Sequence, residues 1–204
     1  MSKFKQFYTK QQQFLLTAVT IISFAFPCSS FSRVKTNTCV IDFTPYEGLY
    51  LIKQNSLPKN MVQPRVLPTA NDQVSISRIE GERILYGNKS GIPYINVKIE
   101  TSDAKLYKKD TLNLLKHLEY LTSLKAKTKT GLRNMNLNGL VVYALSSSSE
   151  KARITDSYVC FPGKGLIVYI EYQNIPVNKN EYIKQRDLFL KKYTLHIANC
   201  KKSK

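Results

Sequence analysis

The sequence LVVYALSSSSEKARITDSYVCFPGKGLIVYIEY spans residues 140–172 and contains three apolar runs. Ser146–Ser149 reads as a loop between the runs Leu140–Leu145 and Ile154–Phe161. Pro162-Gly163 is a typical middle pair of a type II turn before the third run, Leu166–Tyr172. Short apolar runs bounded by turn residues are typical of consecutive antiparallel strands. These residues therefore predict a three-stranded meander.

Further strands precede the meander. Ile95, Val97 and Ile99 alternate with polar residues, which is the period of a half-buried strand. Residues 83–86 form another apolar run, and the turn cluster of residues 87–91 lies between the two. This order predicts a β-hairpin ahead of the meander.

Two segments have the apolar spacing of helices. Four leucines between residues 114 and 121 share one helical face, with Asp110 as the predicted N-cap and the lysines of residues 125–129 at the C-terminal end. Residues 180–200 carry a second apolar stripe, with Asn180 as the predicted cap. The order hairpin, helix, meander, helix predicts an α+β fold, in which helices pack on an antiparallel sheet.

The N-terminus has the parts of a secretory signal peptide. Three lysines precede the apolar run Phe14–Phe26, which Pro27 and a series of small residues follow. The run is shorter than the ~20 apolar residues that cross a bilayer. We therefore expect export to the periplasm or the medium. The alternative is retention in the inner membrane by an uncleaved N-terminal segment.

The chain divides into three parts on this pattern. Residues 1–32 are the signal segment. Residues 33–73 are expected to be loosely structured, because prolines interrupt both long helices and central strands. Residues 74–204 are expected to form the α+β domain. The interrupting prolines are Pro58, Pro64 and Pro68.

Four cysteines occur, at Cys28, Cys39, Cys160 and Cys200. None belongs to a C-x-x-C pair, and His196 is the one histidine near a cysteine in sequence, so neither a metal nor a cofactor is expected. Exported proteins use cysteines chiefly in disulfides. We expect a Cys39–Cys200 disulfide, with Cys160 as a buried thiol. A Cys160–Cys200 bridge is the open alternative.

The sequence contains no recognised catalytic motif: no H-E-x-x-H, no P-loop and no G-x-G-x-x-G. His117 lies among the leucines of the first helix, and His196 lies between Leu195 and Ile197. Packed histidines explain this pattern better than general bases do. The protein is expected not to be an enzyme; a small hydrolase with an unfamiliar site is the weakest interpretation.

The chain is strongly basic, with 31 Lys and Arg against 14 Asp and Glu and a net charge of +17. Its densest basic stretch holds Lys125, Lys127, Lys129 and Arg133, the candidate residues for contact with an anionic partner. A solvated helix end is the simpler interpretation of the same stretch. Nucleic acid is not an expected partner, because no nucleic-acid module accompanies these charges and the leader predicts export.

Thirteen tyrosines and no tryptophan are present. Tyrosine is enriched both in sheets and at protein interfaces. One face of the sheet is therefore expected to be rich in tyrosine, either packed in the core or available to a partner. The tyrosines on predicted strands are Tyr94, Tyr143, Tyr158, Tyr169 and Tyr172.

The order of elements in residues 74–200 resembles the PsbP-type sandwich of photosystem extrinsic subunits and of DcrB-type periplasmic proteins, in which a strand ending near a Pro-Gly turn and a terminal helix close the domain. The resemblance implies partner binding, and the bacterial members include adaptor and immunity proteins of toxin-delivery systems. We therefore expect an exported, non-enzymatic envelope protein that binds a protein partner. A cationic protein that binds anionic lipid or cell-wall polymer is the alternative.

Overall fold

A computed structural model describes residues 31–36, 39–46, 48–57, 64–89, 92–125, 132–150, 153–176 and 178–202. Seven strands form an antiparallel main sheet with the order β3-β6-β7-β11-β10-β9-β8. The expected α+β fold, with helices on an antiparallel sheet, is confirmed. The strands are β3 Tyr50–Ser56, β6 Glu80–Gly87, β7 Tyr94–Thr101, β8 Arg133–Leu137, β9 Leu140–Glu150, β10 Arg153–Gly163 and β11 Leu166–Asn174.

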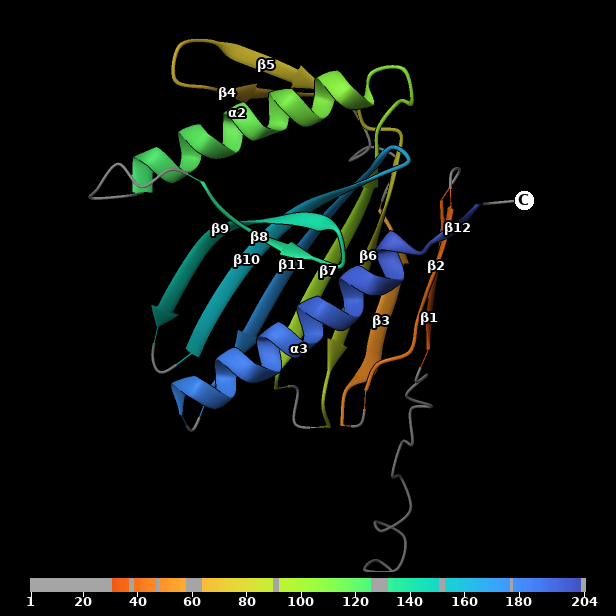
Figure 1. Cartoon of the computed structure of the whole chain (residues 1–204), viewed down its shortest axis with the longest axis vertical. Coiled ribbons are helices and arrows are strands. Elements are labelled where there is room, and N and C mark those ends of the chain that lie inside the picture. The colour runs from red at the N-terminus through yellow and green to blue at the C-terminus, as the bar shows by residue number, and fades with distance from the viewer. Residues whose placement is uncertain are drawn as a thin grey trace, which may run out of the picture.

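Each face of the main sheet carries one helix (Figure 1). Helix α2, Tyr107–Lys125, packs on one face together with a ribbon of β4, Arg65–Pro68, and β5, Gln73–Ile76. Helix α3, Lys179–Ala198, packs on the other face. Successive side chains of a strand point to opposite faces, so neighbouring residues of β10 serve different cores.

A second, small sheet lies beside α3. It consists of β1, Ser32–Lys35, β2, Cys39–Phe43, and β12, Lys201–Lys202, with β2 in the middle. Phe43 joins it to the main core, because its ring centroid lies 4.8 Å from that of Tyr193 on α3 and 5.4 Å from that of Tyr86 on β6. Edge-to-face aromatic pairs of this kind stabilise a core beyond the area they bury.

Residues 33–73 are more ordered than the sequence indicated. This segment supplies most of β1 and all of β2, β3 and β4, and β3 forms one edge of the main sheet. Val34 and Ile41 are buried in the core beneath α3. Pro64 directly precedes β4 and Pro68 is the last residue of β4, positions at which a proline does not break a short strand.

The helices begin at other residues than their cap signals predicted. Helix α2 begins three residues before Asp110, whose buried carboxylate instead accepts hydrogen bonds from the Ser77 and Ser102 hydroxyls. Asn178, and not Asn180, caps α3: its Oδ1 accepts the Glu181 N–H at 2.7 Å. Asp, Asn and Ser bond many backbone groups, so sequence alone places a cap only to within a turn.

Two turns also differ from prediction. Ser146–Ser149 belongs to β9, because Ser146 pairs with Ser157 and Ser149 with Ile154 of β10. Strand β10 continues through the Pro162-Gly163 pair, and the turn falls at Lys164-Gly165, whose φ angles are 52° and 73°. Two consecutive positive φ angles give the type I′ turn that matches the twist of a tight hairpin.

Cys160 and Cys200 are both buried and no disulfide joins them, so the alternative Cys160–Cys200 bridge is absent. Burial raises the pKa of Cys160 to about 12. Residues 1–30 and the side chain of Cys39 lie outside the described residues, so the signal peptide and the Cys39–Cys200 bridge stay predictions. The backbones of β12 and β2 nevertheless lie side by side, because Lys202 pairs with Cys39.

Candidate functional site

The predicted basic stretch is only partly described. Arg133 begins β8 and is exposed at the edge of the main sheet. Lys125 is the last residue of α2, but its side chain lies outside the described residues, as do Lys127 and Lys129. The described part of the chain therefore does not assemble these residues into one site.

A different basic site lies on the main sheet, on the face that also carries α2. It is a groove of about 410 Å³ with walls from β6, β7, β10 and β11. We call it the basic groove. Its side chains combine cations, hydrogen-bonding groups and apolar groups, and the ones used below are Leu57, Arg78, Arg83, Asn96, Lys98, Leu145, Ser157, Tyr169 and Glu171.

The floor of the basic groove is built by two neighbouring strands. Lys98 of β7 pairs with Tyr169 of β11, and the Lys98 ammonium lies 4.4 Å from the centroid of the Tyr169 ring. Beside them, Arg83 donates from Nε to Asn96 Oδ1 at 3.0 Å. These contacts hold two cations on one sheet surface in fixed positions.

One buried carboxylate joins three cations at the end of the groove. Glu100 Oε2 lies 2.8 Å from Arg65 Nη2, and Oε1 lies 3.1 Å from Arg78 Nη2 and 2.8 Å from Lys98 Nζ. The Glu100 side chain is only 2% exposed and that of Arg78 only 8%. Buried charges need such partners, because their transfer from water is costly.

The charges of this cluster do not balance. Three cations surround the single Glu100 carboxylate. Arg83 adds another cation to the groove, and Glu171, which accepts a hydrogen bond from Gln173, adds one carboxylate. The groove therefore has a surplus of positive charge on a concave surface, which is the arrangement that concentrates anions.

The phenol of Tyr169 adds no negative charge to this surface. Its pKa is raised to about 12, first by burial and then by the charge of Glu100, while Arg65 opposes the rise. Arg65 Nη2 also donates to the Tyr169 hydroxyl at 3.4 Å. At neutral pH the phenol is therefore protonated and does not repel an anion.

Sequence reasoning missed this site. The alternation of Lys98 and Glu100 with Ile99 placed both charges on one face of a strand, which was the one available signal. Arg65 is 35 residues from Glu100, and only the folding of the β4–β5 ribbon over the sheet brings them together.

The tyrosines divide between the two faces of the sheet. Tyr158 and Tyr172 are buried in the core beneath α3. Tyr143 and Tyr169 lie on the α2 face, where Tyr169 reaches the basic groove. A single tyrosine-rich face therefore does not form, and of these four tyrosines Tyr158 and Tyr169 line the basic groove.

Neither histidine lines the basic groove. His117 donates from Nδ1 to the Pro68 carbonyl at 2.7 Å, and the His196 ring lies edge-on to Phe43 at 5.3 Å between centroids. Within the described ranges, no group of three or more metal-ligating side chains occurs, and no helix has the length and hydropathy of a membrane span. The side chains that line the groove offer ionic and hydrogen-bonded contacts.

Comparisons with protein-family models, with curated proteins and with solved structures returned no match. The resemblance in element order to the PsbP-type sandwich stays a prediction.

Proposed function

We propose that this chain is an exported, non-enzymatic binding protein whose basic groove receives an acidic segment of a protein partner. The observation that carries the proposal is the ion cluster of three cations around the single Glu100 carboxylate, set in a concave sheet surface. An acidic side chain in the groove would compensate the surplus charge, and partly buried cations bind carboxylates more strongly than solvated ones do.

The mixture of side chains favours a polypeptide over a lipid surface or a wall polymer. Asn96 and Ser157 supply hydrogen-bonding groups, while Leu57 and Leu145 supply apolar contact. A peptide carries groups that complement the cations, the hydrogen-bonding side chains and the apolar side chains of the groove. A flat array of phosphates would need exposed lysines and arginines on a convex or planar surface.

An adaptor or immunity protein is the specific form we propose, on the strength of the resemblance in element order. A basic inhibitor complements a toxin that carries an acidic surface. The groove would then hold one acidic anchor of the toxin, and the rest of the interface would lie around it.

The test is the fluorescence anisotropy of a labelled glutamate-rich peptide titrated with the full mature chain. Arg83→Gln removes a groove cation that forms no ion pair with Glu100, so the fold should be retained. Loss of one charged contact predicts affinity about tenfold weaker. Lys116→Gln, on the exposed face of α2, is the matched control with the same change in net charge and should bind like the unchanged protein.

Binding to vesicles that contain phosphatidylglycerol tests whether the positive charge serves an anionic lipid surface instead of an acidic peptide. Peptide binding that depends on Arg83, with weak vesicle binding, supports the proposal. Equal losses in Arg83→Gln and Lys116→Gln would show that net charge alone attracts the peptide. Tight vesicle binding without peptide binding would favour the anionic-lipid alternative.

A further inference from the structure

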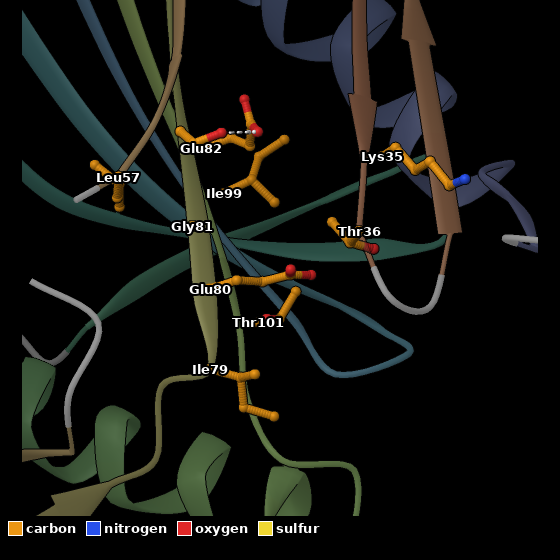
Figure 2. Close-up of a pocket in the computed structure, with 10 residues that line it drawn as sticks. Lys35, Thr36, Leu57, Ile79, Glu80, Gly81, Glu82, Ile99 and Thr101 are labelled. Carbon is orange, nitrogen blue, oxygen red and sulfur yellow. Dashed lines mark hydrogen bonds between the residues drawn. The ribbon is translucent and has the colours of Figure 1, made fainter. Parts of the chain in front are cut away.

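A second cleft lies between the small sheet and the edge of the main sheet, and it has the opposite charge (Figure 2). Its volume is about 490 Å³. One wall is the end of β1 at Lys35 and Thr36; the other is the start of β6, with Glu80 and Glu82. Figure 2 shows both glutamates extending from β6 while the Lys35 side chain points away from them.

Glu82 is held by neutral donors only. Its carboxylate accepts the Ser56 hydroxyl at 2.8 Å and the Gln54 amide at 3.3 Å. No lysine or arginine of the described ranges forms an ion pair with it. In a chain of net charge +17, a cleft carboxylate that no described lysine or arginine pairs with is a site for a cationic ligand.

Thr101 gives an independent indication of a ligand. It pairs with Glu80 across β6 and β7 and lines the same cleft. The residue is 1% exposed, and its hydroxyl has no hydrogen-bond partner within the described part of the chain. A buried hydroxyl without a partner is costly, so a group that enters the cleft and bonds to it is favoured.

Apolar groups complete the lining. Ile99, which is buried, lies on the same side of β7 as Thr101, and Ile79, which is exposed, lies just before β6 (Figure 2). A bare Ca²⁺ or Mg²⁺ ion needs a shell of oxygen ligands, which this lining does not supply. An organic cation with an apolar stem matches both kinds of surface.

We propose that this cleft binds a primary ammonium group on an alkyl stem, as in a lysine side chain. The ammonium lies against Glu82 and Glu80 and donates one N–H to the Thr101 hydroxyl, while the stem packs on Ile99 and Ile79. The inference is independent of the basic groove, because no carboxylate or cation is shared between the two sites.

The test is a titration of the full mature chain with n-pentylammonium, followed by the backbone amide signals in nuclear magnetic resonance spectra. Saturable shifts at Thr101 and Glu82 are expected. The compound n-pentanol has the same alkyl stem without the charge, and it should produce no saturable shifts at these two residues. Two further ligands distinguish the source of the ammonium group. Tighter binding of a blocked lysine peptide would identify a protein partner, and tighter binding of the free diamine cadaverine would identify a small metabolite.

Variants make the assignment specific. Glu82→Gln keeps the shape of the side chain and should weaken n-pentylammonium binding about tenfold, since one charged contact is lost. Thr101→Val removes only the hydroxyl and should weaken it about threefold. Glu119→Gln, on the exposed face of α2, is the charge-matched control and should have no effect. Circular dichroism verifies that each variant folds.

Three results would overturn the inference: n-pentanol binding as tightly as n-pentylammonium, the absence of saturable shifts at Thr101, or equal losses in Glu82→Gln and Glu119→Gln. None of them bears on the basic groove, whose own test uses an acidic peptide.

Discussion

Arg65 and Glu100 form a 2.8 Å ion pair between elements that are distant in the sequence. Arg65 belongs to β4, which packs with α2 over the main sheet, and Glu100 belongs to β7, an interior strand of that sheet. The pair therefore fastens the outer ribbon to the sheet at the position where the basic groove ends. Stability and binding are linked there, because the same carboxylate also holds Arg78 and Lys98.

Glu100→Gln should strongly destabilise the protein. The substitution leaves Arg78, Lys98 and Arg65 close together without the anion that compensates them, and Arg78 is almost fully buried. Breaking a buried ion pair from one side typically costs roughly 3–5 kcal/mol. Urea denaturation followed by circular dichroism measures the change in the free energy of unfolding.

Arg65→Gln is the matched control for that prediction. The Arg65 side chain is 34% exposed, so solvent screens its contribution, and a loss of about 1 kcal/mol is expected. If both variants lost the same free energy, Glu100 would not be the anchor of the cluster.

Gly165→Ala should cost more stability than Gly163→Ala. Both glycines have positive φ, at 73° and 84°, where an alanine is strained by about 1–2 kcal/mol. A Cβ at Gly165 would also lie 3.1 Å from the Ser102 carbonyl oxygen, whereas one at Gly163 meets nothing within 4 Å. Thermal unfolding of the two variants under identical conditions gives the difference, and equal losses would contradict the described β10–β11 turn.

Alkaline pH should unfold the protein cooperatively. Burial raises the pKa of Tyr169 from 10.0 to about 12, and burial also raises the pKa values of Tyr86 and Tyr193. The folded state thus binds these protons more tightly than the unfolded state. Their stabilising contribution is complete below about pH 10 and is lost as the pH rises towards 12 and above.

Tyrosinate absorbance measures this directly. The absorbance of the buried phenols should appear together with the loss of circular dichroism. Full ionisation of all tyrosines near pH 10 in a protein that remains folded would show that they are not buried.

Cys160 should resist alkylation in the folded protein. Its thiol is buried and its pKa is raised to about 12, so almost no thiolate is present at neutral pH. Iodoacetamide labelling followed by peptide mapping should modify Cys160 only after unfolding. The same map, made without reductant, tests the predicted Cys39–Cys200 bridge, and a disulfide peptide that contains Cys160 would contradict both expectations.

The sequence predicted the strands whose signals are local. Ile95, Val97 and Ile99 alternate, and the apolar runs of residues 140–172 are separated by turns, so the meander could be found without tertiary information. Strand β8 was not predicted, although Asn138-Gly139, with φ angles of 56° and 78°, is a strong two-residue hairpin signal between it and β9.

Other features were beyond local reasoning. The serines of residues 146–149 have low strand propensity, and they are extended because β10 pairs with them. Asp110 has the side chain of a cap, but Ser77 and Ser102 hold it, and Ser77 lies 33 residues away. The basic groove depends on contacts of the same kind, between charges that only the folded sheet brings together.

Mapping the binding of an acidic peptide onto the backbone amides tests the central claim most directly. With increasing glutamate-rich peptide, we predict saturable shifts centred on residues 96–98 of β7 and 169–171 of β11, which form the floor of the basic groove. Shifts spread evenly over the exposed lysines of α2 and α3, with none at Lys98 and Tyr169, would contradict the account. They would show that only the overall positive charge attracts the peptide.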